Sequence, residues 1–481
     1  MGGAALHARP SPGHLMPEAG AEAGLVHVVG AGLAGLAAAV RLVEAGRRVT
    51  LHEQAPQAGG RCRSFHDATL GRSIDNGNHL VLSGNRALLD YARRTGGADA
   101  LEELRPAAFP FLDLRDGACW TLRPGGLWLL DPARRVPGSR PLDYLAALRC
   151  LTAGSGQAVA DRLSPTGRLF APLWRPLAVS ALNGPAERVS ARLFGAVLRE
   201  TLLRGETACR PVLAPRGLSA AFVDPALALL RDAGAGLRLG ARVEGLTFAE
   251  DRVAGFSAGG EAVALGPFDS VILAAPAWSA ERLVPGLTVP PPGAAIVNLH
   301  VRLEAPVRLP GGFPFVGLIG GTAEWLFVRG DLLSVTVSDA DALAGLPAEE
   351  IAGRLWAEIV PHLAPAPRLG DPIPPFRVVK ERRATPDQSP ESVARRPGPR
   401  TLWTNLMLAG DWTETGLPAT LEAAVRSGNR AAEATLSSGN NPIRRSGPFP
   451  AFTSFRHRPI WTDGGAVLAR PGPEGQSKKR G

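Results

Sequence analysis

The sequence has 481 residues, of which 45% are apolar and 20% are charged, and such a chain is too long for a single hydrophobic core. Its net charge is +9, but residues 438–481 hold eight basic and two acidic side chains, so this tail carries +6 and the rest is nearly neutral. That distribution argues against a nucleic acid-binding face, and four widely spaced cysteines argue against a disulfide framework or a zinc site.

A βαβ unit is predicted directly after residues 1–23, a leader without apolar periodicity that we expect to be flexible. Residues 25–29 and 49–53 have the composition of short strands, and residues 33–44 between them have the pattern of a helix. Two strands joined by a crossover helix are typical of the first unit of a parallel nucleotide-binding sheet.

The turn between the first strand and the helix has the spacing Gly-x-Gly-x-x-Gly and consists of Gly30, Ala31, Gly32, Leu33, Ala34 and Gly35. In such a turn the first glycine permits a sharp bend, the second lets the backbone approach a pyrophosphate, and the third lets the helix pack closely on the strand. Glu53, which ends the second strand, is placed to accept hydrogen bonds from an adenosine ribose. A tight turn can also exist without a ligand, but these features together predict a dinucleotide site.

Gly59, Gly60 and Arg61 follow the second strand, where two glycines admit a close phosphate and a guanidinium can neutralise it. The run from residue 26 to residue 61 resembles the amine oxidase and phytoene desaturase superfamily of flavoproteins. The resemblance implies that the cofactor is FAD and that Arg61 lies near its pyrophosphate. It also implies an α/β fold, with a Rossmann-type FAD-binding domain of the glutathione reductase-like kind and an interleaved α+β substrate domain.

A second motif near the end of the sequence supports the same resemblance. A buried strand is expected to end at Gly410, followed by Asp411 and by a helix over residues 418–436. The segment resembles the C-terminal FAD motif of the superfamily, which implies that Asp411 contacts the ribityl and pyrophosphate part. The helix start, with Thr420 and Leu421, would then face the pyrimidine end of the flavin, where a helix N-terminus stabilises negative charge.

The two motifs frame a region of different character, rich in tryptophan, proline and amphipathic stretches. Strands are also expected over residues 238–246 and 402–410, and the resemblance implies that the backbone of Val243 meets the adenine. The expected layout is a flexible leader at 1–23, an FAD-binding domain made of 24–100, 205–290 and 396–437, a substrate domain made of 101–204 and 291–395, and a disordered basic tail at 438–481.

Three local strings, residues 75–79, 380–385 and 410–420, resemble the squalene-associated branch of the superfamily, the hydroxysqualene dehydroxylases of bacterial hopanoid synthesis. This branch implies the replacement of the allylic hydroxyl of hydroxysqualene by hydride, which gives squalene. Three alternatives remain open at this point. The protein would otherwise be a carotenoid or phytoene-type desaturase, an amine oxidase, or a flavin-binding scaffold without turnover.

Loss of an allylic hydroxyl as water needs a proton donor beside a dry tunnel. The candidate catalytic residues are Asp75, His79 and Lys380, although the position of Lys380 departs from that of the superfamily's lysine. Gly77, Asn78 and His79 are also expected beside the flavin, and His79 could instead order the backbone after an Asn-Gly turn. Residues that could line a polyprenyl tunnel, or simply pack in a core, are Phe109, Phe111, Trp120, Trp128, Trp174, Phe313, Phe315, Trp325 and Phe327.

The expected partner is a hydrophobic isoprenoid, with no nucleic acid and no metal. A C30 hydrocarbon comes from a bilayer, so we expect a cytoplasmic protein that contacts the inner membrane surface peripherally, since no apolar run approaches about 18 residues. The arginine-rich tail could assist on anionic lipid or remain solvated and disordered. No second nucleotide motif is apparent, which favours a separate electron donor.

Overall fold

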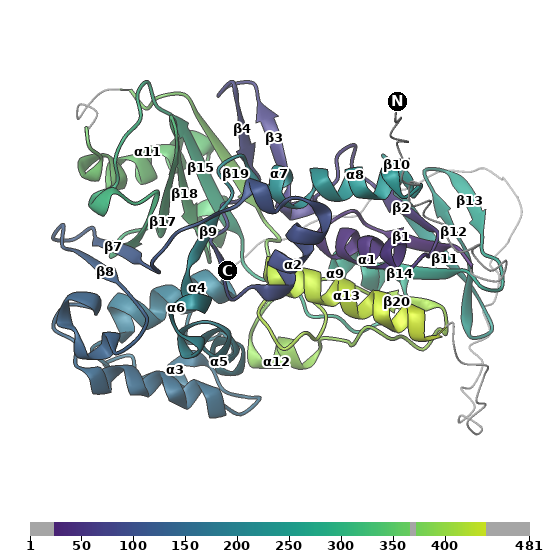
Figure 1. Cartoon of the computed structure of the whole chain (residues 1–481), viewed down its shortest axis with the longest axis horizontal. Coiled ribbons are helices and arrows are strands. Elements are labelled where there is room, and N and C mark those ends of the chain that lie inside the picture. Colours follow the sequence, from purple (N-terminus) through teal and green to yellow (C-terminus); the bar gives the residue numbers. More distant parts are fainter. Residues whose placement is uncertain (1–23, 366–371, 439–481) are drawn as a thin grey trace, which may run out of the picture. The chain divides into compact units, whose positions relative to one another are not determined.

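The structure is a computed structural model that describes residues 24–365 and 372–438. The expected leader at 1–23 and all but the first residue of the expected tail lie outside the described residues. Two large sheets organise the part of the chain that is described (Figure 1). They draw their strands from alternating stretches of the sequence, which supports the interleaved domain layout as a proposal.

The first sheet is parallel and contains five strands in the order β10-β2-β1-β14-β20. The strands are β1 (Val26–Val29), β2 (Val49–Glu53), β10 (Gly236–Leu239), β14 (Ser270–Leu273) and β20 (Leu406–Leu408). Most residues on β1, β2 and β14 are buried on both faces of the sheet, and most of them are apolar. Burial on both faces is the usual state of a parallel sheet covered by helices, so this is a Rossmann-type α/β domain.

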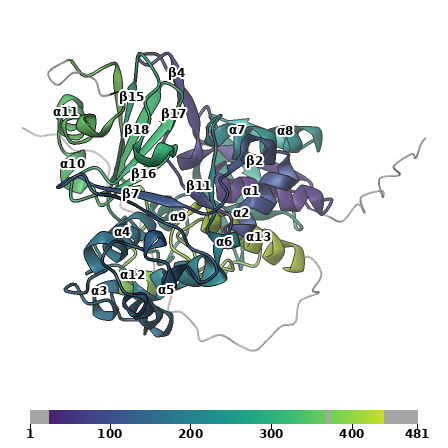
Figure 2. The ribbon, with the colours of Figure 1, turned by 60° about the vertical axis from the view of Figure 1, so that its left-hand side comes forward.

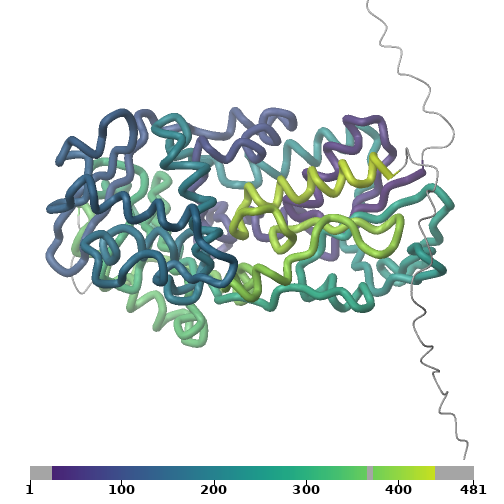
Figure 3. Tube along the Cα trace, turned by 90° about the horizontal axis from the view of Figure 1, so that it is seen from below, coloured from purple at the N-terminus to yellow at the C-terminus, as the bar shows by residue number. Residues whose placement is uncertain are grey.

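Two helices that are distant in sequence cover this sheet side by side. Helix α1 (Leu33–Glu44) packs along α13 (Leu421–Ser438), and Figure 3 shows the yellow α13 beside the purple N-terminal unit. Their close approach depends on Gly428, because a Cβ atom there would lie 2.2 Å from the carbonyl oxygen of Ala34. The end of the chain's described part is therefore fixed against its beginning.

The second sheet contains seven strands in the order β19-β15-β18-β17-β16-β7-β8 and is antiparallel except for the pair β16–β7 (Figure 2). Its strands are β7 (Phe109–Asp113), β8 (Cys119–Leu122), β15 (Ile296–Arg302), β16 (Phe315–Ile319), β17 (Trp325–Arg329), β18 (Leu332–Val337) and β19 (Phe376–Glu381). Helices α10 (Asp341–Ala344) and α11 (Ala348–Ile359) pack against it, with Leu355 and Ile359 buried in the same apolar cluster as Leu299.

A helical subregion completes the lobe of the second sheet. It comprises η5 (Pro141–Thr152), α3 (Val159–Arg162), η6 (Phe170–Trp174), α4 (Arg175–Leu182) and α5 (Ala191–Glu200). Helix α5 begins where the Ser190 side chain accepts a hydrogen bond from the Leu193 amide, and its Phe194 is fully buried in one cluster with Phe315 of the sheet.

The remaining elements are short. Small sheets are formed by β3 (Ser64–Asp67) with β4 (Arg72–Asp75), by β5 (Val81–Leu82), β9 (Pro211–Leu213) and β6 (Glu102–Glu103), and by β11 (Val243–Ala249), β12 (Arg252–Ala258) and β13 (Glu261–Ala264). The other α-helices are α2 (Arg86–Thr95), α6 (Glu206–Cys209), α7 (Leu218–Phe222), α8 (Asp224–Asp232), α9 (Ala277–Leu283) and α12 (Pro390–Ala394). Short 3-10 helices are η1 (Gly60–Cys62), η2 (Ala98–Ala100), η3 (Trp128–Leu130), η4 (Pro132–Arg134), η7 (Leu202–Arg204), η8 (Pro310–Gly312) and η9 (Val360–His362). Within the described residues, no helix combines the length and the apolar character needed to cross a bilayer.

Three element boundaries differ from the sequence-based expectation. The expected strand over 238–246 is wrong, because the chain turns at Gly240 with a φ of +72° and separates β10 from β11. The expected strand over 402–410 is reduced to β20, since Leu402 is 87% exposed and lies in a loop. Helix α13 begins at Leu421 rather than at residue 418, which leaves a longer loop before it.

Two histidines stand at buried positions of the parallel sheet where apolar residues are usual. His27 Nδ1 on β1 lies 3.2 Å from His52 Nε2 on β2, and both rings meet the edge of Phe256. Burial lowers the pKa of His27, and burial together with the neighbouring His27 lowers the pKa of His52 to about 4. Both imidazoles are therefore neutral in the folded protein near pH 7.

This pair predicts a loss of stability in mild acid. An unfolded histidine binds its proton near pH 6.5, whereas folded His52 resists it down to about pH 4, so stability is complete above pH 6.5 and declines as the pH falls towards 4. Urea unfolding of the wild type at pH 7.5 and pH 5 should show this decline. In His52→Phe it should be smaller by on the order of 1 kcal/mol. The exposed control His66→Phe should behave like the wild type, and an equal decline in both variants would contradict the assignment.

Candidate active site

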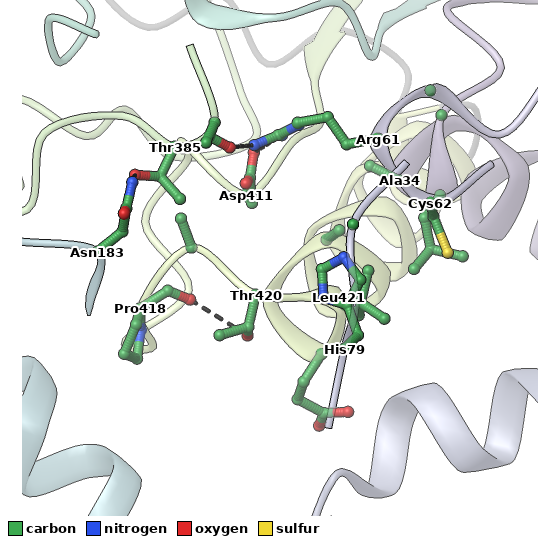
Figure 4. Close-up of a pocket in the computed structure, with 18 of the residues that line it drawn as sticks. Ala34, Arg61, Cys62, His79, Asn183, Thr385, Asp411, Pro418, Thr420 and Leu421 are labelled. Atoms are coloured by element: carbon green, nitrogen blue, oxygen red, sulfur yellow. Dashed lines mark hydrogen bonds and ion pairs between the residues drawn. The ribbon is translucent and has the colours of Figure 1, made fainter. Parts of the chain in front are cut away.

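A cavity of about 670 Å³ extends from the glycine turn of the first sheet to the aromatic face of the second. Figure 4 shows residues from the N-terminal unit, the helical subregion and the C-terminal loop around this one space. Its two ends differ in character. Backbone and charged groups surround the end at the parallel sheet, and large apolar side chains surround the other.

The glycine turn presents its backbone to the cavity. Gly30 has a φ of +108°, and a Cβ atom there would lie 2.6 Å from the carbonyl oxygen of Ala274. A Cβ atom on Gly32 would meet nothing within 4 Å, so this cavity-lining backbone stays open to a ligand. Gly35 does not line the cavity, and a Cβ atom there would lie 1.9 Å from the Gly30 carbonyl oxygen. The three glycines thus meet the three steric demands of a dinucleotide turn.

Leu33 and Ala34, in the first turn of α1, also line the cavity, whereas Ala31 does not. Ala31 instead donates its amide to Glu53 Oε2 over 2.7 Å, and the Ala55 amide donates to Glu53 Oε1 over 2.9 Å. These two bonds fix a buried carboxylate at the cavity wall and leave lone pairs for further donors. Such an arrangement suits the hydroxyls of a ribose and opposes a phosphate group.

Arg61 joins the two predicted flavin motifs. Its Nη2 lies 2.6 Å from Asp411 Oδ1, although the two residues are 350 positions apart, and its Nη1 donates to the Ala384 carbonyl (Figure 4). Burial alone would lower the pKa of Arg61, but Asp411 and then Glu381 oppose this, and the net change is upward. The guanidinium therefore stays charged, and it lines the cavity beside the glycine turn.

Gly59 and Gly60 bring this arginine close to the glycine turn. Both have positive φ values, +105° and +54°, and the Gly59 amide donates to the Ala31 carbonyl over 2.8 Å. A Cβ atom on Gly60 would lie 3.3 Å from the Gly32 Cα atom. The two glycine-rich turns therefore lie directly against one another, with open backbone and a cation at the same wall.

The C-terminal loop and the start of α13 form another part of the cavity wall. Gly410, with a φ of +144°, donates its amide to Ser427 Oγ over 2.8 Å, which ties the loop to the helix. Thr420 Oγ1 accepts the Ala423 amide over 3.2 Å and so caps the helix N-terminus. Thr420 and Leu421 both line the cavity, and the positive end of the helix dipole faces it.

Val243 and the predicted segment Gly77, Asn78 and His79 also line the cavity, at different places along it. Asn78 Nδ2 donates to Thr336 Oγ1 over 3.0 Å, and Thr336 Oγ1 donates in turn to Asn298 Oδ1 over 2.8 Å. Asn298 belongs to β15 and Thr336 to β18, so these bonds join the loop of Asn78 to the second sheet. All three residues line the cavity and provide it with hydrogen-bonding groups.

Of the three candidate acids, the structure brings only His79 to the cavity. Asp75 does not line it, because its carboxylate is held by Arg329 at 3.0 Å, by the Ser64 hydroxyl and by the Leu218 amide. Lys380 points away and donates its Nζ to the carbonyl of Leu346. The geometry therefore does not support Asp75 or Lys380 as a catalytic acid.

His79 is enclosed by protein, and this loss of solvent lowers its pKa to about 4 despite the opposing charge of Asp75. Its imidazole is therefore neutral near pH 7, with one nitrogen that donates and one that accepts. Such a ring can position a hydroxyl group but carries no extra proton to give away.

The aromatic residues suggested for a tunnel divide into two groups. Phe109, Phe111, Trp325 and Phe327 line the cavity, together with Leu198 of α5. Trp174 and Phe315 are buried in the core instead, and Trp120, Trp128 and Phe313 do not line the cavity either. Core packing thus accounts for part of the set, as it often does for aromatic side chains.

Sequence reasoning missed two groups of cavity residues. Trp278, Arg282 and Arg383 line the polar end, where the Arg383 guanidinium lies 5.0 Å from the centre of the Trp278 ring. Glu422 also lines the cavity while its carboxylate accepts the amides of Ala87 and Leu88 at the start of α2. Arg383 lies within the string 380–385, but its place in the cavity, like that of the others, arises from contacts between distant segments.

Comparison with known proteins agrees with this geometry. The family model of flavin containing amine oxidoreductases matches residues 33–436. The chain belongs to this family. As a member of it, the enzyme is a flavin-dependent oxidoreductase, and the residues at the polar end fit a flavin nucleotide through open backbone, a fixed carboxylate and a charged guanidinium.

Two relatives named hydroxysqualene dehydroxylase match over most of their length. The protein of Rhodopseudomonas palustris is 48% identical and that of Zymomonas mobilis 40% identical, each match covering 86% of this chain and 99% of the relative. The predicted resemblance to this branch is confirmed. A probable zeta-carotene desaturase of Synechococcus elongatus is 26% identical over 85% of this chain and 98% of its own.

Solved structures support the expected fold. Cyclohexylamine oxidase from Brevibacterium oxydans gives a TM-score of 0.61 at 16% identity and covers 86% of this chain and 99% of its own. Putrescine oxidase gives a TM-score of 0.59 at 17% identity over 86% of this chain and 99% of its own. At such identities the likeness concerns the fold alone, and the α/β fold predicted from the sequence is confirmed.

The contact between Arg61 and Asp411 predicts a defect in flavin retention. Arg61→Gln removes the positive charge at the wall where phosphates are expected, and the flavin dissociation constant should rise about 10- to 100-fold. Arg61→Lys keeps the charge but loses the two-pronged contact, so its effect should be intermediate. The surface control Arg105→Gln should retain flavin as the wild type does. Normal flavin content in Arg61→Gln would contradict this role.

Proposed function

We propose that the flavin is FAD and that the enzyme converts hydroxysqualene into squalene by reductive dehydroxylation. The proposal is supported most directly by the 48% and 40% identity to hydroxysqualene dehydroxylases over nearly their whole length. The cavity agrees with it, because one polar end suited to a dinucleotide continues into an apolar end suited to a hydrocarbon.

Each part of FAD has a proposed set of contacts in the cavity. Glu53 would accept hydrogen bonds from the ribose hydroxyls, and Val243 would present its backbone to the adenine. Gly30, Gly32, Gly59, Gly60 and Arg61 would surround the pyrophosphate, with Asp411 on the ribityl side. Thr420 and Leu421 would place the α13 N-terminus at the pyrimidine edge, where it favours negative charge on the reduced ring.

The reaction adds one proton and one hydride to the alcohol. The allylic C–O bond breaks, the hydroxyl leaves as water with the added proton, and a new C–H bond forms at the same carbon. When bound and reduced, the flavin would supply the hydride. The protein's own contribution is to exclude water through Phe109, Trp325 and Phe327, and to hold the hydroxyl where it leaves.

His79 is the group that we place at the leaving hydroxyl. It lies in the cavity and is neutral, so it would orient the C–O bond by a hydrogen bond or relay a proton that arrives from another donor. The hydrogen-bonded amides and hydroxyl of Asn78, Asn298 and Thr336 lie on the same stretch of wall and can accept the departing water.

The reaction partners follow from the same proposal. We place the enzyme in the cytoplasm, where its cysteines stay reduced, and at the inner membrane surface, from which the isoprenoid comes. Cys62, Cys119, Cys150 and Cys209 are all free thiols. Because the dinucleotide turn serves the flavin, a separate electron donor would reduce it.

The overall reaction can be tested with the purified holoenzyme. Under anaerobic conditions, chemically reduced enzyme and hydroxysqualene should give squalene, one molecule per flavin oxidised. A desaturase would leave hydroxysqualene unchanged and would instead require an electron acceptor and a carotene. Reoxidation of the flavin without squalene, or no reoxidation at all, would refute the proposal and favour a flavin-binding scaffold.

His79→Gln tests the neutral imidazole. Turnover per bound flavin should fall by about 10²- to 10⁴-fold, the usual contribution of a positioned acid or base. For the wild type, turnover should show no inflection near pH 6.5, because the pKa of His79 is about 4. A rate that rises as the pH falls through 6.5 would instead require a protonated imidazole and would contradict the neutral form.

A larger side chain on α4 would fill the apolar end of the cavity. Ala181 lines this end of the cavity, and Ala181→Phe should obstruct a long hydrocarbon, with kcat/KM per bound flavin reduced by about 10-fold or more. The smaller change Ala181→Val should have a lesser effect. Flavin content should remain normal in both variants. An unchanged kcat/KM in Ala181→Phe would show that the substrate does not occupy this end.

A further inference from the structure

Leucines are exposed in one stretch of chain, at η3 and along η5 of the helical subregion. Among the residues that the structure describes, nine large apolar side chains are exposed, and five of them lie between residues 127 and 148. These five are Leu127, Leu130, Leu142, Leu145 and Leu148, which we name the leucine surface. Single exposed leucines need no explanation, but a concentration of this kind marks an interaction site.

Three of these leucines form a stripe along η5. In a 3-10 helix residues three apart lie above one another, and Leu142, Leu145 and Leu148 are 74%, 48% and 42% exposed. The adjacent stripe of Tyr144, Ala147 and Cys150 is buried. The sequence of η5 therefore has two apolar stripes, and the fold uses only one of them.

The helix cannot rotate to bury the second stripe. A Cβ atom on Gly195 of α5 would lie 2.2 Å from the Cys150 carbonyl oxygen, so η5 and α5 are in backbone contact. The Tyr144 ring meets the edge of Trp128 at 5.1 Å, and its hydroxyl accepts the Val136 amide over 2.9 Å. The contact with Trp128 also joins η5 to η3, whose neighbour Leu127 is 78% exposed and whose Leu130 is 66% exposed.

The segment of chain that carries the leucine surface has a net positive charge. Residues 123–168 contain seven arginines and three aspartates, and of these Arg140 and Arg149 are exposed on either side of the η5 stripe. Asp143 is partly neutralised by Arg168 at 3.7 Å. Exposed leucines among arginines match an anionic lipid surface, in which the apolar side chains enter the acyl boundary and the guanidinium groups meet the head groups.

The leucine surface is also close to the apolar end of the cavity. Helix α5 lies between η5 and the cavity, because its Gly195 contacts η5 while its Phe194, Val197 and Leu198 line the cavity. At this point, η5 and α5 would therefore separate a bilayer on this face from the place proposed for the hydrocarbon.

We propose that the leucine surface is a docking site for an anionic lipid bilayer, through which the enzyme takes up its apolar substrate. The proposal of bilayer docking is supported by the exposed stripe and its arginines, whereas the proposal of substrate uptake rests on the proposed function. The two parts are separable by experiment.

Vesicle sedimentation of the full-length holoenzyme tests the docking. Vesicles of phosphatidylcholine with phosphatidylglycerol should bind the wild type more tightly than vesicles of phosphatidylcholine alone. The variant Leu142→Gln/Leu145→Gln/Leu148→Gln should lose about 10-fold or more of its partition coefficient, since each leucine contributes burial of apolar area. A matched control, Leu239→Gln/Phe268→Gln/Leu402→Gln, changes three exposed apolar residues elsewhere and should bind as the wild type does.

Equal vesicle binding by the stripe variant and the control would overturn the docking, and it would leave a protein partner as the occupant of this surface. Normal flavin absorbance per protein shows that each variant is folded. Turnover then separates the two proposals. Substrate dispersed in detergent should be converted normally by the stripe variant, while substrate delivered in vesicles should be converted about 10-fold more slowly. No turnover of either form by the wild type would refute the proposed function without affecting the sedimentation result.

Discussion

The contact of Arg61 with Asp411 is the interaction on which the site depends. It joins a glycine-rich turn at the start of the sheet to a loop at its end, 350 residues away, and it lies where the two turns of Gly32 and Gly59 meet. The Asp411 side chain is 7% exposed and that of Arg61 is 39% exposed, so removing Arg61 would leave an uncompensated buried carboxylate. The pair therefore ties correct assembly of the Rossmann-type sheet to the presence of one fixed positive charge at the cavity wall.

The character of the cavity follows from which sheet supplies each wall. The parallel sheet ends in turns that expose backbone amides and one carboxylate, whereas the second sheet presents Phe111, Trp325 and Phe327. Between them, enclosure lowers the pKa of His79 to about 4, although Asp75 opposes the change. The same enclosed surroundings that suit a hydrocarbon thus keep His79 neutral, which restricts it to orienting the hydroxyl or relaying a proton.

The sequence predicted the features that depend only on residues close together in the chain. The spacing of Gly30, Gly32 and Gly35 is a steric requirement of one turn, and the structure shows close backbone contacts at Gly30 and Gly35 and open backbone at Gly32. The acids were harder to predict, because the position of Lys380 depends on the carbonyl of Leu346 and that of Asp75 on Arg329, residues 34 and 254 positions away. Boundaries failed where a single residue changes the path of the chain, as Gly240 does between β10 and β11.

In the helical subregion too, the sequence alone could not predict which face of η5 is buried. A period of three is ambiguous in a sequence, since apolar residues at 142, 145 and 148 and at 144, 147 and 150 describe two equally good faces. The contact of Gly195 with Cys150 decides between them, because only a residue without a side chain lets α5 approach that stripe. The leucines are therefore exposed because the stripe of Tyr144, Ala147 and Cys150 is the one that packs against the rest of the protein. The leucine stripe stays exposed because rotating η5 to bury it would break the backbone contact between Gly195 and Cys150. A large exposed apolar patch on a protein marks a site of interaction with a membrane or another protein.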